Sequence, residues 1–214
     1  MDSTEWDRRY ASADLIWSAG PNAVVESEAR DLPAGAALDL ASGEGRNALW
    51  LASLGWRVTA VDFSTVATAR ARRLAAERLG RRADLFTAVT ADLLSWRPTP
   101  SSADLVLLAY LQLPAGQRRQ VHRMAADALA SGGTLILVAH HLDNLEHGVG
   151  GPPDPSVLFT QRDVLSDLAG SGLIVERAER LERRVATEGE GHGHNDAEGQ
   201  VALDVFVRAR RNRR

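Results

Sequence analysis

The residues of this sequence that could do chemistry together are a glycine turn and three aspartates. Gly43 and Gly45 lie in the segment ALDLASGEGRN, residues 37–47. Glycine is favoured where a backbone must turn sharply and let a ligand approach closely. Three acids lie near this turn in the chain or follow the next apolar runs, and they are Asp39, Asp62 and Asp92. The pattern predicts one polar site built from successive strand ends.

The charge of these acids indicates the kind of ligand. Ligands bind outside the carboxyl ends of the strands in open α/β sheets. Asp39 directly precedes the turn, where it would repel a diphosphate and attract an ammonium or a sulfonium. Asp62 can accept hydrogen bonds from ribose hydroxyls, and Asp92 can accept one from the exocyclic amine of adenine. For each acid alone, a helix-capping or solvent-facing role stays an alternative.

Alternating short apolar runs and helical patterns position these residues and predict an α/β fold. Strands are expected at 36–40, 56–61, 83–89, 104–109, 134–139, 174–185 and 200–208. Helices are expected at 46–54, 65–79 and 117–129, the last of them ended by a turn at Gly132 and Gly133. The expected fold is Rossmann-like, with a mostly parallel seven-stranded sheet, one antiparallel edge strand and helices on both faces.

The segment 140–159 interrupts this regular pattern with several glycines and prolines. Loops of this length in compact domains are usually functional lids or disordered segments. Thr160 after it resembles a helix N-cap, with Asp163 in the first turn. We expect one domain over residues 1–214, with an N-terminal helical cap segment at 1–34 and a core at 35–214.

The composition excludes several kinds of chemistry. The chain has no cysteine, and all 25 of its basic residues are arginine. Cysteine nucleophiles, thiolate metal sites, phosphate-binding loops with lysine and Schiff bases are therefore excluded. A net charge of −3 argues against nucleic acid as a partner. No signal peptide or membrane-spanning run is present, so we expect a cytoplasmic protein with no membrane partner.

The segment from Asp39 to Gly45 resembles motif I of class I S-adenosylmethionine-dependent methyltransferases. Asp62, Asp92 and residues 104–114 match the positions of the later motifs. The N-terminal segment WDRRY is similar to the tellurite-resistance and thiopurine methyltransferase branch, in which such a segment folds over the bound cofactor. The sequence has Ala41-Ser42 where the class often has Gly-Cys. Because both replacements are small, we expect a slightly shifted backbone and an intact pocket.

The resemblance implies that S-adenosylmethionine is the cofactor and S-adenosylhomocysteine the product. It places Asp39 and the glycine turn around the methionine part, Asp62 on the ribose, and Asp92 on the adenine amine. It places Phe63 beside the adenine and Leu93 on its ring. The residues implied to bind the cofactor are Trp6, Tyr10, Trp17, Asp39, Ala41, Ser42, Gly43, Gly45, Arg46, Asn47, Asp62, Phe63, Ala91, Asp92, Leu93, Ala109 and Tyr110.

Methyl transfer is an in-line displacement that depends mainly on alignment, so a general base is optional. Tyr110 would lie near the transferable methyl group, and His140 or His141 could act as a base or steer the acceptor, although a structural histidine is the alternative. His192 and His194 lack a third ligand, so no metal site is expected. We expect a small-molecule acceptor, namely a thiol, amine, phenol or metalloid oxyanion, and either a monomer or a homodimer.

Two other functions remain as alternatives at this point. An NAD-dependent oxidoreductase could use the same strand, turn and helix, although Asp39 and the absence of a Tyr-x-x-x-Lys pair count against it. A non-catalytic module could bind S-adenosylmethionine without transferring its methyl group.

Overall fold

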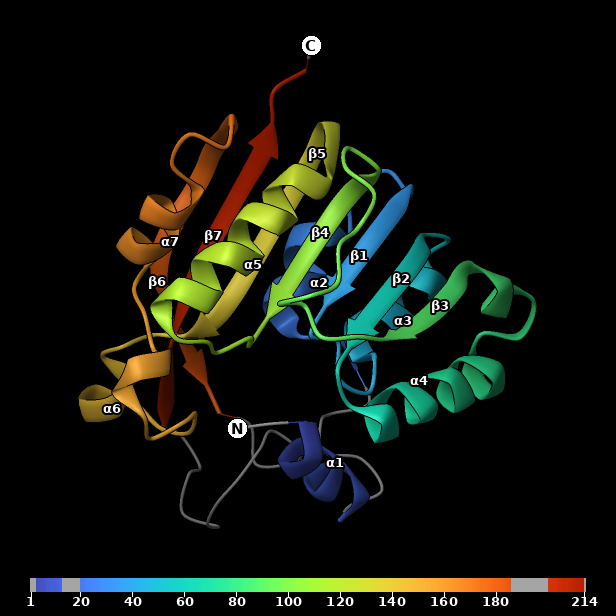
Figure 1. Ribbon diagram of the computed structural model, residues 1–214, viewed down its shortest axis with the longest axis horizontal. Coiled ribbons are helices and arrows are strands. Elements are labelled where there is room, and N and C mark those ends of the chain that lie inside the picture. Colours follow the sequence, from blue (N-terminus) through green and yellow to red (C-terminus); the bar gives the residue numbers. More distant parts are fainter. Residues whose placement is uncertain (1–2, 13–19, 186–199, 214) are drawn as a thin grey trace.

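The computed structural model describes residues 3–12, 20–185 and 200–213 of the chain. Their centre is a seven-stranded sheet with the strand order β3-β2-β1-β4-β5-β7-β6 (Figure 1). The strands are β1 Ala36–Leu40, β2 Arg57–Asp62, β3 Phe86–Thr90, β4 Ala103–Ala109, β5 Leu129–His140, β6 Leu173–Arg184 and β7 Val201–Arg211. The α-helices are α1 Ser3–Ala11, α2 Ala23–Ala29, α3 Arg46–Ser53, α4 Thr65–Arg78, α5 Ala115–Ala128, α6 Asn144–His147 and α7 Gln161–Leu168. Two 3-10 helices, Gly80–Leu85 and Pro155–Val157, complete the described elements.

Strands β1 to β5 pair in parallel, and β7 runs antiparallel to both β5 and β6. The predicted α/β fold, with a mostly parallel seven-stranded sheet and one antiparallel strand, is therefore confirmed. The antiparallel strand is β7, which lies one place in from the edge, and β6 forms the edge itself.

Helices cover both faces of the sheet because buried side chains alternate along its strands. Leu38 and Leu40 pack in one core cluster with side chains of α5 and α7, such as Val121 and Val164. Ala37, whose side chain lies on the opposite face of β1, packs in the other cluster with side chains of α2 and α3. The parallel strands end at the lower edge of Figure 1, where α1 and α6 lie. This edge is the one at which α/β sheets bind ligands.

The prediction of a turn at Gly132 and Gly133 that ends a helix was wrong. The helix α5 ends at Ala128, and both glycines lie inside β5, where the pairing with β4 shifts in register. A Cβ atom on Gly133 would lie 2.7 Å from the carbonyl oxygen of Ala103, and Gly132 has a φ of 79°. Gly133 is thus needed for the close approach of β5 to β4, and Gly132 for its positive φ.

The segment 140–159 contains the short helix α6 and a 3-10 turn, so it is more ordered than its sequence predicted. Asn144 fastens it, because its Oδ1 accepts a hydrogen bond from the backbone N–H of Leu203 at 2.7 Å. Its Nδ2 donates to the carbonyl oxygen of Gly150 at 2.7 Å. The predicted N-cap at Thr160 is confirmed: its hydroxyl accepts from the backbone N–H of Asp163 and the Asp163 carboxylate accepts from the backbone N–H of Thr160.

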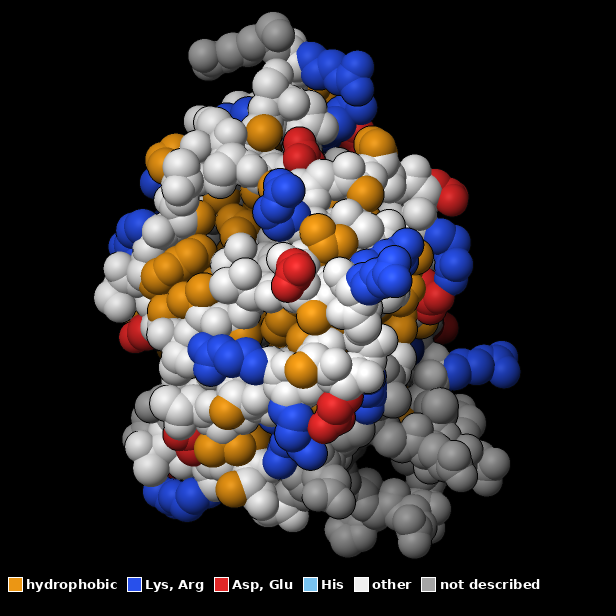
Figure 2. Space-filling view, turned by 90° about the vertical axis from the view of Figure 1, so that its right-hand side faces the viewer, with side chains coloured by type: hydrophobic (Ala, Val, Ile, Leu, Met, Phe, Trp, Pro, Cys, Tyr) orange, Lys and Arg blue, Asp and Glu red, His pale blue; other side chains and the backbone are white. Residues whose placement is uncertain are grey.

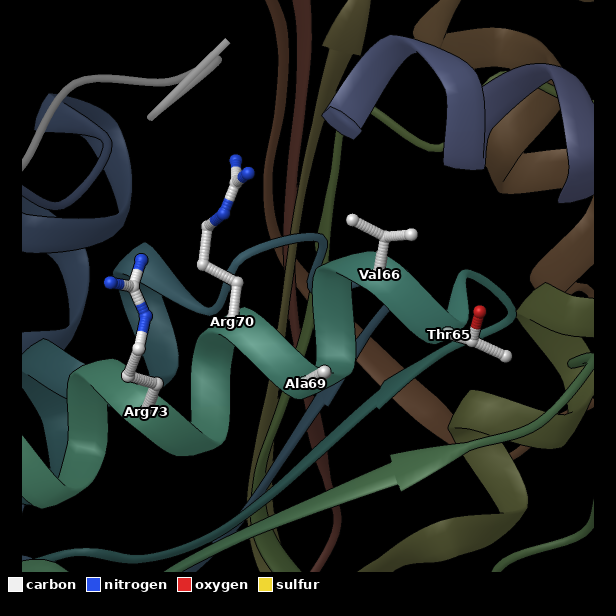
Figure 3. Close-up of a pocket in the computed structure, with 5 residues that line it drawn as sticks. All are labelled: Thr65, Val66, Ala69, Arg70 and Arg73. Carbon is white, nitrogen blue, oxygen red and sulfur yellow. The ribbon is translucent and has the colours of Figure 1, made fainter. Parts of the chain in front are cut away.

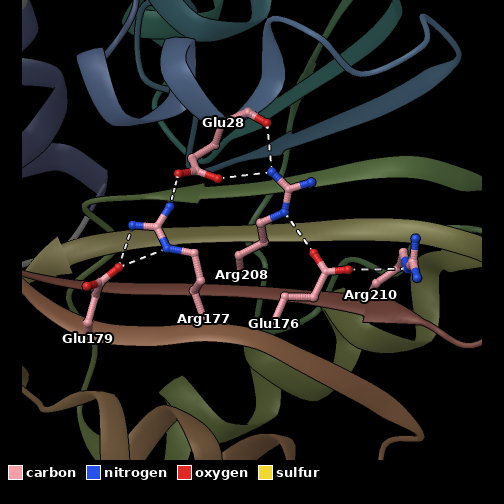
Figure 4. A network of polar contacts seen from close by, with 6 residues as sticks. All are labelled: Glu28, Glu176, Arg177, Glu179, Arg208 and Arg210. Atoms are coloured by element: carbon pink, nitrogen blue, oxygen red, sulfur yellow. Dashed lines mark hydrogen bonds and ion pairs between the residues drawn. The ribbon is translucent and has the colours of Figure 1, made fainter.

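The outer strands carry a network of ion pairs on one face of the sheet (Figure 4). Glu28 of α2 accepts hydrogen bonds from Arg177 of β6 and from Arg208 of β7. Glu176 accepts from Arg208 Nε at 2.9 Å, and Arg177 Nε donates to Glu179 at 2.9 Å. The network ties α2 to the last two strands through acids and arginines of β6 and β7.

The described surface over β3 and α4 has no extended basic area. On this side, Figure 2 shows arginines separated by acidic, apolar and uncharged side chains. Within residues 3–12, 20–185 and 200–213, no helix has both the length and the apolar character that a membrane span requires.

Candidate functional site

The turn after β1 has the geometry that its glycines predicted. Gly43 and Gly45 have φ values of 55° and 82°, in the left-handed region. Gly45 immediately precedes α3, and a Cβ there would lie 3.3 Å from the Cβ of Ala71. Ala41 also has a positive φ, 58°, at the position where the methyltransferase class often has glycine. The backbone therefore keeps a glycine-like path through Ala41.

The Ala41→Gly variant is expected to be more stable than the wild type by about 0.5–1 kcal/mol. A left-handed non-glycine residue costs roughly 1–2 kcal/mol, of which the greater freedom of glycine in the unfolded chain offsets about half. Urea unfolding followed by circular dichroism measures the difference. An Ala48→Gly variant in α3 is the control and should be less stable, and a loss of stability in Ala41→Gly would contradict the strain.

Asp39 lies beneath this turn with its side chain 1% exposed. Neither carboxylate oxygen has a hydrogen-bond partner among the described residues, and the buried hydroxyl of Ser42 also has none. Burial raises the pKa of Asp39 to about 7, against the opposing effects of the Ala48 backbone and the positive charge of Arg46. An acid held in this way is a site for a cation, because a buried charge without a partner is costly.

Asp62 connects the loops that follow β1 and β2. Its Oδ2 accepts a hydrogen bond from the backbone N–H of Gly43 at 2.7 Å, and its Oδ1 accepts from Ser64 at 2.9 Å. The backbone N–H of Ala91 donates to the carbonyl oxygen of Asp62 at 2.9 Å, so the loop after β3 is attached as well. Burial raises the pKa of Asp62, although these amides oppose the shift.

Asp92 lies just after β3, the strand next to β2, so the three acids lie at or near the carboxyl ends of the neighbouring strands β1, β2 and β3. Its side chain is exposed, and Oδ1 accepts from the backbone N–H of Leu94 at 2.8 Å. The next residue, Leu93, is buried in the core cluster on the α5 side of the sheet. Phe63 is half-buried beside Asp62. The sheet thus brings the predicted acids to one edge, where Asp39 and Asp62 are buried and Asp92 is exposed to solvent.

Asn47 of α3 has a partner within the protein. Its Oδ1 accepts a hydrogen bond from the backbone N–H of Asn22 at 2.8 Å. Asn22 in turn caps α2, since its Oδ1 accepts from the backbone N–H groups of Val24 and Val25. Through these bonds, the Asn47 side chain in the first turn of α3 fixes the N-terminal end of α2 against α3.

Contacts that no sequence pattern indicated attach α1 to the glycine turn. Asp7 accepts hydrogen bonds from the hydroxyl groups of Ser64 and Thr65, at the start of α4. Arg70 of α4 pairs with Glu44, which is 3% exposed between the two glycines of the turn. Arg70 also donates to the carbonyl oxygen of Tyr10 at 3.0 Å. Asp7 lies in the segment WDRRY and Glu44 in the glycine turn, but neither residue was predicted to make these contacts.

The N-terminal aromatic residues are only partly placed. The rings of Trp6 and Tyr10 lie 5.5 Å apart in α1, and Tyr10 is 4% exposed. Trp17 lies outside the described residues, as do His192 and His194.

A second polar cluster lies where β4 and β5 end. Asp204 of β7 is fully buried, and its Oδ2 accepts hydrogen bonds from Tyr110 Oη and from Arg183 Nε, both at 2.8 Å. His140 Nδ1 lies 3.4 Å from Asp204 Oδ1. Tyr110 has a left-handed φ of 60°, which aims the residue after β4 in this unusual direction. Asp204 was not among the predicted site residues, and the one feature that could have drawn attention to it is its place as a lone acid in the apolar run VALDVFV.

His141 is held separately from this cluster. It is 4% exposed, and its Nδ1 accepts a hydrogen bond from the backbone N–H of Asp143 at 3.0 Å. Its Nε2 lies 3.2 Å from Oε1 of Gln161. Both ring nitrogens have partners within the protein, so of the two predicted histidines only His140 joins Tyr110.

An open hollow of about 460 Å³ lies along α4 and is lined by Thr65, Val66, Ala69, Arg70 and Arg73 (Figure 3). All of its lining residues belong to α4. Two of them, Thr65 and Arg70, also contact Asp7 and Glu44, respectively, so the hollow adjoins the contacts that attach α1 to the glycine turn.

Comparisons with known proteins agree with this arrangement. Residues 37–133 match the family model described as a methyltransferase domain. No curated protein matches the chain. The fold is similar to a structure from work on the conversion of a disulfide bond into a thioacetal group during echinomycin biosynthesis, at 21% identity and a TM-score of 0.71, over 98% of this chain and 92% of that chain.

Two further solved structures share the fold. An S-adenosylmethionine-dependent methyltransferase from Methanosarcina mazei is 18% identical, with a TM-score of 0.65, over 91% of this chain and 100% of that chain. TehB from Haemophilus influenzae is 17% identical, with a TM-score of 0.70, over 90% of this chain and 63% of that chain. The structures show a shared fold, and the family model shows a methyltransferase domain over residues 37–133.

Proposed function

We propose that the residues around the glycine turn hold S-adenosylmethionine and that the enzyme methylates a small molecule. The observation that carries the proposal is Asp39, whose two buried carboxylate oxygens have no hydrogen-bond partner among the residues that the structure describes. An ammonium group would supply the missing partner, and the buried hydroxyl of Ser42 in the same turn also has no partner within that part of the chain. The residues present therefore fit the cationic cofactor that the family implies.

The remaining contacts follow from the positions of the acids. Asp62 would hold the ribose, because a carboxylate already fixed by two backbone amides is oriented before any ligand arrives. Asp92, Ala91, Leu93 and Phe63 would surround the adenine. When bound, S-adenosylmethionine supplies a methyl group attached to a sulfonium, whose sulfur is neutral after the methyl group has left. Ala109 and Tyr110, after β4, would lie on the acceptor side.

The segment 1–34 acts in this proposal as a cap on the core 35–214. Its support is the attachment of α1 through Asp7 to the start of α4, together with the contact of Tyr10 with Arg70, which pairs with Glu44 in the turn. A cap held by these contacts would keep water from the reacting groups.

The acceptor is proposed as a thiol, phenol, amine or metalloid oxyanion. The support for this set is the resemblance of the N-terminal segment WDRRY to the tellurite-resistance and thiopurine methyltransferase branch, and TehB shares the fold. Calorimetric titration with S-adenosylhomocysteine and, separately, with NAD tests the cofactor. Binding of NAD alone would overturn the assignment. Assays for S-adenosylhomocysteine formation with small thiols, phenols, amines, selenite and tellurite then test the acceptor.

An Asp62→Asn variant is expected to bind S-adenosylhomocysteine about 30-fold more weakly, which corresponds to ~2 kcal/mol. The amide keeps the shape of the side chain but loses the charge that strengthens hydrogen bonds from ribose hydroxyls. Calorimetric titration measures the affinity, and thermal unfolding checks the fold. Glu77→Gln, which changes an exposed acid on α4, is the control and should bind as the wild type does. Unchanged affinity in Asp62→Asn would place the ribose elsewhere.

A further inference from the structure

The second polar cluster contains two buried atoms whose natural partners are each other. Oδ1 of Asp204 and Nδ1 of His140 both lack a hydrogen-bond partner among the described residues. They lie 3.4 Å apart, slightly beyond the usual length of a charge-assisted hydrogen bond. Such bonds are often long in ligand-free enzymes and shorten when the substrate binds.

The surroundings of Asp204 keep it ionised. Burial raises its pKa, but His140 and Arg183 lower it further, so the pKa of Asp204 lies below its usual value. Tyr110 and Arg183 occupy its other oxygen, so Oδ1 is the oxygen that faces the histidine. An ionised Oδ1 favours a proton on Nδ1 of the neutral ring and so leaves Nε2 as the basic nitrogen.

The ring of His140 is held in this orientation from two sides. The Tyr110 ring lies 4.9 Å away, centre to centre. Gly151, from the segment between β5 and α7, approaches so closely that a Cβ there would lie 2.8 Å from Cγ of His140. The His140 side chain keeps 15% of its exposure, and no hydrogen bond to its Nε2 occurs among the described residues. A histidine with a fixed ring and an unengaged Nε2 can serve as a base.

We propose that His140 and Asp204 form a base dyad for an acceptor that arrives protonated, with a neutral phenol O–H or thiol S–H group. The proposal rests on the methyltransferase function above and narrows its acceptor class. Arg183 and Tyr110 are positioning residues, since they hold Asp204 rather than the acceptor. A metalloid oxyanion would need no base and is disfavoured by this arrangement.

The lone pair of the acceptor oxygen or sulfur forms the new bond to the methyl carbon, and the sulfonium carbon–sulfur bond breaks with its electron pair going to sulfur. The proton of the acceptor goes to Nε2 of His140, and Asp204 stabilises the resulting imidazolium. Arg183, the other charged group in the cluster, opposes that charge and favours release of the proton to water after each turnover.

The first test needs neither cofactor nor acceptor. Two-bond hydrogen–nitrogen correlation spectra of the nitrogen-15-labelled protein at pH 8 report which ring nitrogen carries the proton. We expect His140 to carry it on Nδ1, with the signal assigned by its loss in His140→Gln. The Asp204→Asn variant should shift the proton toward Nε2. A wild-type ring with its proton on Nε2 would overturn the dyad whether or not the protein binds S-adenosylmethionine.

The second test uses small phenols and thiols as probes. At pH 7 we expect His140→Gln to lower kcat at least 100-fold, a typical contribution of a general base. Activity should recover as the pH approaches that at which the probe ionises by itself. His147→Gln, an exposed histidine of α6, is the control and should keep the wild-type profile. An equal loss at every pH, or no loss, would overturn the proposal.

A binding assay with S-adenosylhomocysteine distinguishes failure of the base dyad from failure of the proposed methyltransferase function. His140→Gln should bind it within about 2-fold of the wild type, because the dyad lies on the acceptor side. If the wild type does not bind it, the proposed function fails. If it binds and the histidine tests fail, only the dyad is wrong.

Discussion

Asp39→Asn is expected to raise the melting temperature at pH 8 while cofactor affinity falls about 100-fold. Burial raises the pKa of Asp39 from its ordinary 3.8 to about 7. The folded protein therefore holds a proton there that the unfolded chain releases, and stability falls as the pH rises from about 4 to 7. Above pH 7 the ionised, unpartnered carboxylate costs on the order of 4 kcal/mol, by conversion of the pKa shift.

Asparagine removes that cost because it cannot ionise, but it leaves an unpaired amide that costs about 1–3 kcal/mol. The net gain is about 2 kcal/mol, or roughly 4–8 °C for a chain of this size. Cofactor binding changes in the opposite direction, because the cationic cofactor loses its carboxylate partner. The expected 100-fold loss of affinity corresponds to about 2.7 kcal/mol of binding free energy.

Thermal unfolding of both proteins from pH 4 to pH 8, with calorimetric titration of S-adenosylmethionine at pH 8, checks this pair of effects. The advantage of Asp39→Asn should appear as the pH rises and be absent at pH 4. Glu77→Gln is the control for a surface acid. A variant that is less stable at pH 8, or that binds the cofactor normally, would show that Asp39 carries no functional charge.

Asp167→Ala is expected to destabilise the protein by about 3–5 kcal/mol, the usual result of breaking a buried ion pair. Asp167 of α7 is fully buried, and Arg118 Nε of α5 donates to it at 2.7 Å. His122 Nδ1 lies 3.1 Å from the same carboxylate. In Asp167→Ala, the buried guanidinium of Arg118 would lose the carboxylate that neutralises its charge.

The pH dependence of this contribution has the opposite direction to that of Asp39. Burial raises the pKa of Asp167, but His122 and Arg118 outweigh it and lower the pKa to about 2. The stabilisation is therefore complete above about pH 4 and is lost as the pH falls toward 2. Urea unfolding at pH 7 measures the main effect. Glu77→Gln, in an exposed pair with Arg73, should change stability by less than about 0.5 kcal/mol. A similarly small change in Asp167→Ala would contradict the argument.

The part of the site that the sequence could predict lies close to β1. Asp39 is a single acid in an apolar run followed by glycines, and short-range patterns of this kind reflect local backbone needs. The parallel order of β1, β2 and β3 then follows from their helical connections, so Asp62 and Asp92 could be placed at the same edge.

The second cluster could not be predicted because it depends on long-range register. Asp204 meets Tyr110 and His140 only because β7 inserts between β5 and β6, with His140 paired opposite Asp204. A sequence pattern identifies a closing strand but not the partner of each residue in it. Gly132 and Gly133 were misassigned for a related reason, since glycine marks a close strand contact as readily as a turn.

The charged network on the outermost strand has a consequence for how copies of this protein meet. An exposed edge strand offers unpaired backbone groups on which another polypeptide can add a strand and begin aggregation. The edge strand β6 carries the charged side chains of Glu176, Arg177 and Glu179, and its pairing with β7 shifts between Val175 and Arg177. A foreign strand would have to desolvate these charges and follow an irregular edge. The same side chains that join α2 to the sheet therefore also make this part of the edge unfavourable for the addition of another strand.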